Sequence, residues 1–217
     1  GYAQEGHGEE ALNYFQQMQN EGISPNGITM ISILKVYGSI GDYDKAKKLH
    51  DDFITRDLLA KDFILATALV DMYAKCAQLE KAQDVFDQLQ FRDLVSWNVL
   101  LAGYAQLDKD CTILDLFNKM IGEGMVPDSI TFTVVLNACS HSGLVDEGEM
   151  VYFNMSTGYG VMQSLEHHTC MVDLYGRAGH FDKAVAVINT MQTFDYLPVW
   201  SALLGACQNQ QNLELGR

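Results

Sequence analysis

Apolar residues recur along the chain at the three- and four-residue spacing of α-helices. In the stretch 94–128, two such faces are separated by a break in the pattern around Asp108. The faces consist of Trp97, Leu100, Leu101 and Tyr104, and of Ile113, Leu116, Phe117 and Met120. Gly122, Gly124 and Pro127 follow the second face and are typical of a helix end. The stretch is therefore predicted to form two helices.

The same pattern returns at an offset of 102 residues. This offset aligns GYAQ at 1–4 with 103–106, EGISPN with EGMVPD, and ALVDMYAK with CMVDLYGR. Such matches without gaps indicate an internal repeat, about two copies of which fit in the chain. Each copy divides into shorter units, and the predicted boundaries are 1–26 (partial), 27–62, 63–93, 94–128, 129–164, 165–196 and 197–217 (partial).

A single helix pair cannot bury both of its apolar stripes, so neighbouring pairs are expected to stack. The predicted fold is an all-α solenoid, with the first helices on one wall and the second helices on the other. Ser96, Thr29 and Thr131 are the predicted N-caps of first helices. Gly148 and Gly176 interrupt helical patterns and are expected to permit close packing. Trp97 and Trp200 are expected in the core.

Composition and charge narrow the possible functions. Of the 217 residues, 48% are hydrophobic and 19% are charged, which favours an ordered protein. No apolar run is long enough to span a bilayer. The first residues resemble neither a signal nor a transit peptide and read as part of a helical unit, so we expect a fragment of a longer chain. A net charge of −14 is unfavourable for nucleic-acid binding, so any binding face must concentrate the few cations.

Candidate chemical groups are sparse. His7 and Glu9 match half of a nucleobase deaminase signature, but no PCxxC follows. His167, His168 and Cys170 lie close in sequence without a fourth metal ligand. The five cysteines are odd in number and lack CxxC spacing, which favours buried thiols in a reducing compartment: Cys76, Cys111, Cys139, Cys170 and Cys207. We therefore predict no catalytic residue, metal or cofactor.

The repeats resemble the pentatricopeptide repeat family of plants. The unit LVSWNVLLAGYAQLDKDCTILDLFNKMIGEGMVPD is close to the standard motif, and the alternation of unit lengths is similar to the P-L-S subclass. The final VWSALLGACQNQQNLELGR resembles the start of an E-type extension. The resemblance covers essentially the whole chain. It implies a right-handed superhelical solenoid that binds single-stranded RNA, one base per repeat, as the recognition segment of an organellar C-to-U editing factor.

In that family, the fifth and the last residue of a repeat read one base together. The pair Thr67 and Asp93 then suggests guanine, and Asn98 with Asp128 suggests uracil, giving 5′-GU-3′. The remaining candidates carry no base assignment: Ile31 with Asp62, Thr133 with Ser164, Thr169 with Tyr196, and Asn26 alone.

Other positions follow from the same resemblance. The second residue of a repeat sandwiches the base, and here it is aliphatic in Ile28, Ile64, Val95 and Ile130. Glu166 breaks this pattern. Lys75 and Arg177 hold equivalent positions and are candidate phosphate contacts. Acids of the second helices are expected on a solvated outer face: Glu9, Glu10, Asp51, Asp52, Asp146 and Glu147.

Partners and location follow from the resemblance as well. Besides RNA, editing-factor proteins or a deaminase are expected partners, in a plastid or mitochondrion, with no membrane. The alternative is a scaffold that holds a protein or peptide in the same concave groove, which the acidic charge favours. Cations on the inner wall and acids on the outer one would favour RNA.

Overall fold

The computed structural model describes residues 8–55, 62–107 and 110–191, and the short stretches 197, 199–201 and 204–205. All regular structure in these residues is helical. The helices are α1 (Gly8–Asn20), α2 (Gly27–Ile40), α3 (Tyr43–Thr55), α4 (Phe63–Lys75), α5 (Leu79–Asp87), α6 (Leu94–Gln106), α7 (Asp110–Gly122), α8 (Ser129–Ser142), α9 (Val145–Thr157), α10 (Leu165–Arg177) and α11 (Phe181–Thr190). None of these helices combines the length and hydropathy that a membrane crossing requires.

The chain divides into two compact bodies, Gly1–Leu107 and Asp108–Arg217. We call them the N-terminal body and the C-terminal body. The N-terminal body contains α1 to α6, and the C-terminal body contains α7 to α11. The two helices of the repeat 94–128 therefore belong to different bodies.

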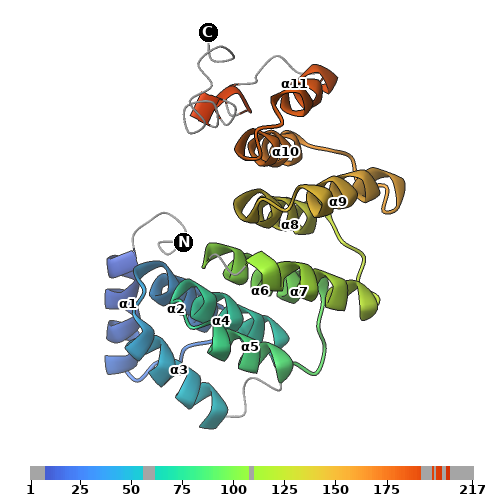
Figure 1. Ribbon diagram of the computed structural model, residues 1–217. Helices are drawn as coiled ribbons and strands as arrows, with labels where there is room; N and C mark the ends of the chain where they lie inside the picture. The colour runs from blue at the N-terminus through green and yellow to red at the C-terminus, as the bar shows by residue number, and fades with distance from the viewer. Residues whose placement is uncertain are drawn as a thin grey trace. The chain divides into compact units, whose positions relative to one another are not determined.

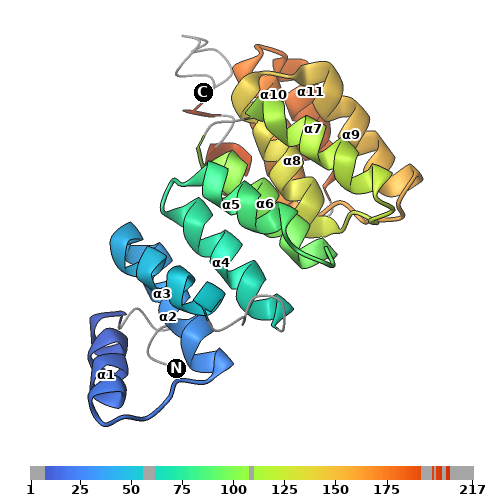
Figure 2. The same ribbon diagram turned by 90° about the horizontal axis from the view of Figure 1, so that it is seen from below.

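Within each body the helices stack as the repeat pattern predicts. In the N-terminal body, α2 packs on α4 and α4 packs on α6, while α3 and α5 each contact the first helices on either side (Figure 1). In the C-terminal body, α8 packs on α10, and α9 contacts both of them (Figure 2). The first helices begin at residues 27, 63, 94, 129 and 165. The all-α solenoid fold is thus confirmed.

The apolar faces form the core of each body. Trp97, Leu100 and Leu101 are fully buried in α6, and Ile113 and Met120 are fully buried in α7. Burial of each such side chain contributes roughly 1.5–3 kcal/mol to folding. The Trp97 ring meets the edge of Phe86, with centroids 4.7 Å apart.

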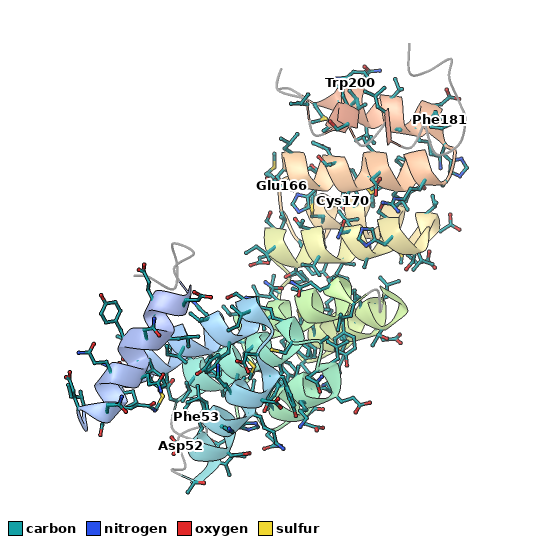
Figure 3. The ribbon with its side chains drawn as sticks, turned by 90° about the vertical axis from the view of Figure 1, so that its left-hand side faces the viewer. Asp52, Phe53, Glu166, Cys170, Phe181 and Trp200 are labelled. Carbon is teal, nitrogen blue, oxygen red and sulfur yellow. The ribbon has the colours of Figure 1, made fainter. Side chains whose placement is uncertain are left out.

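The second helices separate apolar from acidic residues in the expected way. On α3, Phe53 is fully buried, while Asp51 is exposed and Asp52 is half-buried (Figure 3). Trp200 departs from expectation, because 43% of its surface is exposed (Figure 3). Helical spacing predicts which face of a helix is apolar, but a residue on that face is buried only if another element packs against it.

The first helices are capped one turn earlier than predicted. Their N-caps are Asn26, Asp62, Asp93, Asp128 and Ser164. Asp93 Oδ1 accepts the backbone N–H of Ser96 at 2.8 Å, and the Asp93 N–H donates to Ser96 Oγ at 3.1 Å. Asp128 and Thr131 form the same reciprocal box. The expected N-caps Thr29, Ser96 and Thr131 are instead third helical residues, because the acid or amide before each helix accepts the orphan N–H.

Two glycines permit close helix packing. A Cβ at Gly148 would lie 2.5 Å from Leu174 Cδ2, so a side chain there would force the end of Leu174 on α10 to move. A Cβ at Gly103 would lie 2.5 Å from the Cβ of Ala74, on the neighbouring α4. The packing role predicted for Gly148 is confirmed, and Gly176 is buried within α10.

Candidate functional site

The start of each first helix presents an aliphatic side chain to solvent. The exposed fractions at the second helical residue are 77% for Ile28, 65% for Ile64, 60% for Val95 and 62% for Ile130. Each of these residues lies two positions after a polar N-cap. Within the described residues, neither the core nor a neighbouring helix covers them. The structure therefore keeps an apolar side chain in water at the same place in four successive first helices.

The equivalent place in α10 is different. Glu166 is exposed there, at the start of the helix (Figure 3). The Ser164 hydroxyl donates to Glu166 Oε2 at 2.6 Å. This hydrogen bond lowers the pKa of the Glu166 carboxyl below its ordinary value.

The fifth residues lie deeper than the second residues. Thr67 and Asn98 are buried, whereas Ile31, Thr133 and Thr169 are half-buried. Thr67 Oγ1 is fully covered and makes no hydrogen bond within the described part of the chain. By contrast, the hydroxyls of Thr133 and Thr169 donate to backbone carbonyls one turn back, each at 2.8–2.9 Å. The buried hydroxyl of Thr67 thus lacks the bond that usually compensates burial.

In the repeats that end at Asn26, Asp62, Asp93, Asp128 and Ser164, the last residue has a structural task, since it is the N-cap of the next first helix. One oxygen of Asp62, Asp93 and Asp128 accepts a backbone N–H. Thr67 and Asp93 share the N-terminal body, and Thr133 and Ser164 share the C-terminal body. Asn98 and Asp128 belong to different bodies.

His167, which the sequence suggested only as part of a metal cluster, connects Thr133 with Ser164. His167, the third residue of α10, is fully buried. Its Nδ1 accepts the Ser164 backbone N–H at 3.0 Å, and its Nε2 lies 3.1 Å from Thr133 Oγ1. The sequence signal for this role was an imidazole at the third helical position, where α2, α6 and α8 carry a hydroxyl.

The two candidate phosphate contacts each have a carboxylate partner one turn earlier. Lys75 Nζ lies 2.7 Å from Asp71 Oδ2, and Arg177 Nε lies 2.8 Å from Asp173 Oδ2. Both cations remain partly exposed. Exposed pairs at this spacing contribute only about 0.3–0.5 kcal/mol, so a phosphate can displace the carboxylate. The sequence analysis did not predict these two ion pairs, although each aspartate precedes its cation by the four residues that favour pairing on a helix.

The cluster His167, His168 and Cys170 does not converge on one point. His168 Nδ1 lies 2.7 Å from the Tyr152 hydroxyl, while His167 faces Thr133 and Cys170 Sγ lies 3.9 Å from the Thr133 carbonyl. Burial lowers the pKa of His168 and raises the pKa of Tyr152 to about 12. Within the described residues, no three acidic, histidine or cysteine side chains could hold a metal ion.

Some predicted positions lie outside the described residues. These are His7 of the deaminase-like pair, Tyr196 of the last reading pair, Cys207 and most of the stretch 197–217.

Family models match most of the chain. A pentatricopeptide repeat domain model matches residues 1–51, a PPR repeat family model matches 92–141, and a PPR repeat model matches 65–94, 130–157 and 166–196. The chain belongs to the pentatricopeptide repeat family.

Relatives within this family come from Arabidopsis thaliana. The pentatricopeptide repeat-containing protein CRR2, chloroplastic, is 39% identical over 218 residues, which cover 99% of this chain and 33% of CRR2. A putative pentatricopeptide repeat-containing protein is 40% identical over 207 residues, covering 95% of this chain and 30% of the relative. The chain thus spans about a third of the length of these relatives.

Solved structures of pentatricopeptide repeats share the fold. The crystal structure of PPR10 from maize matches with a TM-score of 0.63 at 18% identity, over 99% of this chain and 36% of PPR10. The PPR domain of A. thaliana protein-only RNase P 1, in complex with tRNA, matches with a TM-score of 0.58 at 14% identity, over 81% of this chain and 95% of that domain. At these identities the likeness establishes the helical-repeat fold.

Proposed function

We propose that this chain binds single-stranded RNA in a sequence-specific way, one base per repeat. The observation that carries the proposal is the set of exposed aliphatic residues at the second position of four first helices, 60–77% exposed. Apolar side chains presented beside polar groups at regular intervals suit flat, partly apolar ligands with polar edges, as nucleobases are. Two relatives of the same fold support it: PPR10 is known in complex with an 18-nt psaJ RNA element, and the RNase P 1 domain in complex with tRNA.

In this proposal each base packs against the exposed aliphatic residue of its repeat. Its Watson–Crick edge then faces the fifth residue and the N-cap of the next first helix. Those side chains are short and polar in Thr67 with Asp93, and in Asn98 with Asp128. Rotation about χ1 of Thr67 would turn its hydroxyl, which has no partner among the described residues, toward the base. The expected sequence read by these two repeats is 5′-GU-3′.

The phosphate contribution is expected to be small. Lys75 and Arg177 are the proposed contacts, and each must first exchange its aspartate partner for a phosphate. We further propose that the parent protein is an organellar editing factor that directs C-to-U conversion through a deaminase, in a plastid or a mitochondrion. The resemblance to P-L-S repeats supports this role, and so does the likeness to relatives named as chloroplastic.

A binding assay tests the proposal. Short single-stranded RNAs that differ only at the two predicted bases are titrated with the chain, and GU is expected to bind most tightly. Asn98→Thr is expected to move the preference at the second base from a pyrimidine toward a purine. Equal affinity for every RNA, unaffected by this substitution, would instead leave the peptide-binding scaffold as the better account.

A further inference from the structure

In the repeat 129–164 a third side chain joins the two residues of the reading pair. His167 accepts the Ser164 backbone N–H at Nδ1, 3.0 Å away. On the other side of the ring, Nε2 lies 3.1 Å from Thr133 Oγ1 and 2.9 Å from the Ser129 carbonyl oxygen. The imidazole is fully buried, so it acts on any ligand only through Thr133, which is half-buried.

These contacts fix which ring nitrogen carries the proton. A backbone N–H can only donate, so Nδ1 of His167 must offer its lone pair to Ser164. The proton of the neutral ring is then on Nε2, which donates toward Thr133 Oγ1 and the Ser129 carbonyl. The Thr133 hydroxyl itself lies 2.9 Å from the Ser129 carbonyl. Because the imidazole N–H also serves that carbonyl, the Thr133 proton can turn to a ligand without leaving the carbonyl unpaired.

The group next to the reading threonine is thus a hydrogen-bond donor, His167 Nε2–H, in the repeat 129–164, and an acceptor, the Asp93 carboxylate, in the repeat 63–93. In the repeat 63–93 the last residue is Asp93, whose carboxylate can only accept. In the proposed complex, the Thr67 hydroxyl would donate its proton to such a carboxylate and offer its lone pairs to the base. A threonine beside an N–H has a lone pair occupied and offers its proton instead. A donor in place of the acceptor therefore changes what the threonine offers to the base, from a lone pair to a proton.

We propose that His167 is a positioning residue that makes the repeat 129–164 select adenine or cytosine. In these bases the central ring nitrogen of the Watson–Crick edge has a lone pair, which the Thr133 proton can meet. In guanine and uracil that nitrogen carries a proton. This inference rests on the proposed function and deepens it, because it names the base class for a repeat whose Thr133 and Ser164 gave no base assignment.

The test uses RNAs in which GU is followed by each of the four bases. With the 217-residue chain, adenine and cytosine at the third base are expected to bind at least about fivefold more tightly than guanine and uracil. His167→Thr keeps a capping hydroxyl, as Thr131 provides in α8, but cannot reach Thr133. It is expected to reduce the third-base preference to less than about twofold while leaving the preference for GU intact.

Two further variants separate positioning from stability. His168→Thr removes the adjacent imidazole, which faces Tyr152, and is expected to retain the third-base preference. Thr133→Val removes the reading hydroxyl with little change in shape and is expected to lose the preference as His167→Thr does. Thermal melts followed by circular dichroism test whether each variant is folded.

The outcomes distinguish the two proposals. A third-base preference for guanine or uracil overturns the inference while the RNA-binding function stands, and so does a preference that His167→Thr and Thr133→Val leave unchanged. If the unmodified chain discriminates at none of the three bases, the proposed function fails and the inference fails with it.

Discussion

At the scale of single residues, Thr67 combines burial with an unmet hydrogen bond. Its Oγ1 has no partner in the described part of the chain, and an unsatisfied buried hydroxyl costs about 1–3 kcal/mol. A binding site explains this cost, because a ligand can supply the missing hydrogen bond, whereas a role in packing alone does not. In our proposal that ligand is the edge of a base.

Thr67→Val should therefore stabilise the protein and impair recognition. We expect the free energy of unfolding to rise by about 1 kcal/mol in urea denaturation, because the valine methyl needs no partner. The preference for guanine at the corresponding base should disappear. Thr169→Val is the control, since the Thr169 hydroxyl already donates to the Leu165 carbonyl and its removal brings no such gain. A loss of stability in Thr67→Val would contradict the prediction.

Asp71 and Asp173 limit the availability of the two proposed phosphate contacts. The double variant Asp71→Asn, Asp173→Asn removes both competing charges, and we expect its RNA affinity to rise about two- to fivefold at low salt. Isothermal titration with a GU-containing RNA measures the change. Asp146→Asn, an exposed acid on α9, makes the same kind of charge change on a second helix and should have a smaller effect. Unchanged affinity in the double variant would remove Lys75 and Arg177 from the interface.

At the scale of elements, one side chain serves both the helix and the proposed readout. Asp93 caps α6 through Oδ1, which accepts the Ser96 N–H, and in our proposal it also faces the base next to Thr67. Because the last residue is the next N-cap in each repeat up to 129–164, the helix boundary places the reading group at a fixed position relative to the exposed aliphatic residue. The spacing of the repeats thus sets the spacing of the proposed base contacts.

Asp93→Asn separates these two roles. An asparagine retains an oxygen for the Ser96 N–H, so the midpoint of thermal unfolding should change little. Its amide adds a donor, which should move the preference at the first base from guanine toward adenine. Asp93→Ala, in contrast, should cost about 1 kcal/mol of stability, because α6 loses its cap. A preference for guanine that survives Asp93→Asn would show that Asp93 acts only as a cap.

At the scale of the whole molecule, the acidic charge should make RNA binding weakly dependent on salt. The net charge is −14, and only Lys75 and Arg177 are proposed to meet phosphates. Two phosphate contacts predict a slope of log K against log[salt] of about −1.4 for single strands. Fluorescence anisotropy across a salt series measures this slope. A slope steeper than about −4 would require a basic surface that this proposal does not contain.

Much of the fold was predictable because its information is local and repeated. The offset of 102 residues and the helical spacing of apolar residues predicted the helix pairs, and the buried Trp97, Ile113 and Met120 confirm it. The N-caps were placed wrongly, although Asp93 and Ser96 form a capping box that is legible in the sequence. Both members of the box can accept a backbone N–H, and the acid, which lies first in the sequence, is the N-cap.

The sequence by itself determined the all-α repeat architecture and the kind of residue at each repeated position, because backbone hydrogen bonds and amphipathic faces depend on neighbours within a few turns. Only the tertiary structure decided which of these side chains meet across helices. The exposure of Ile28, the burial of the Thr67 hydroxyl and the contact of His167 with Thr133 depend on how α-helices far apart in sequence pack. Residues 34 positions apart come within hydrogen-bonding distance only once α8 and α10 are stacked.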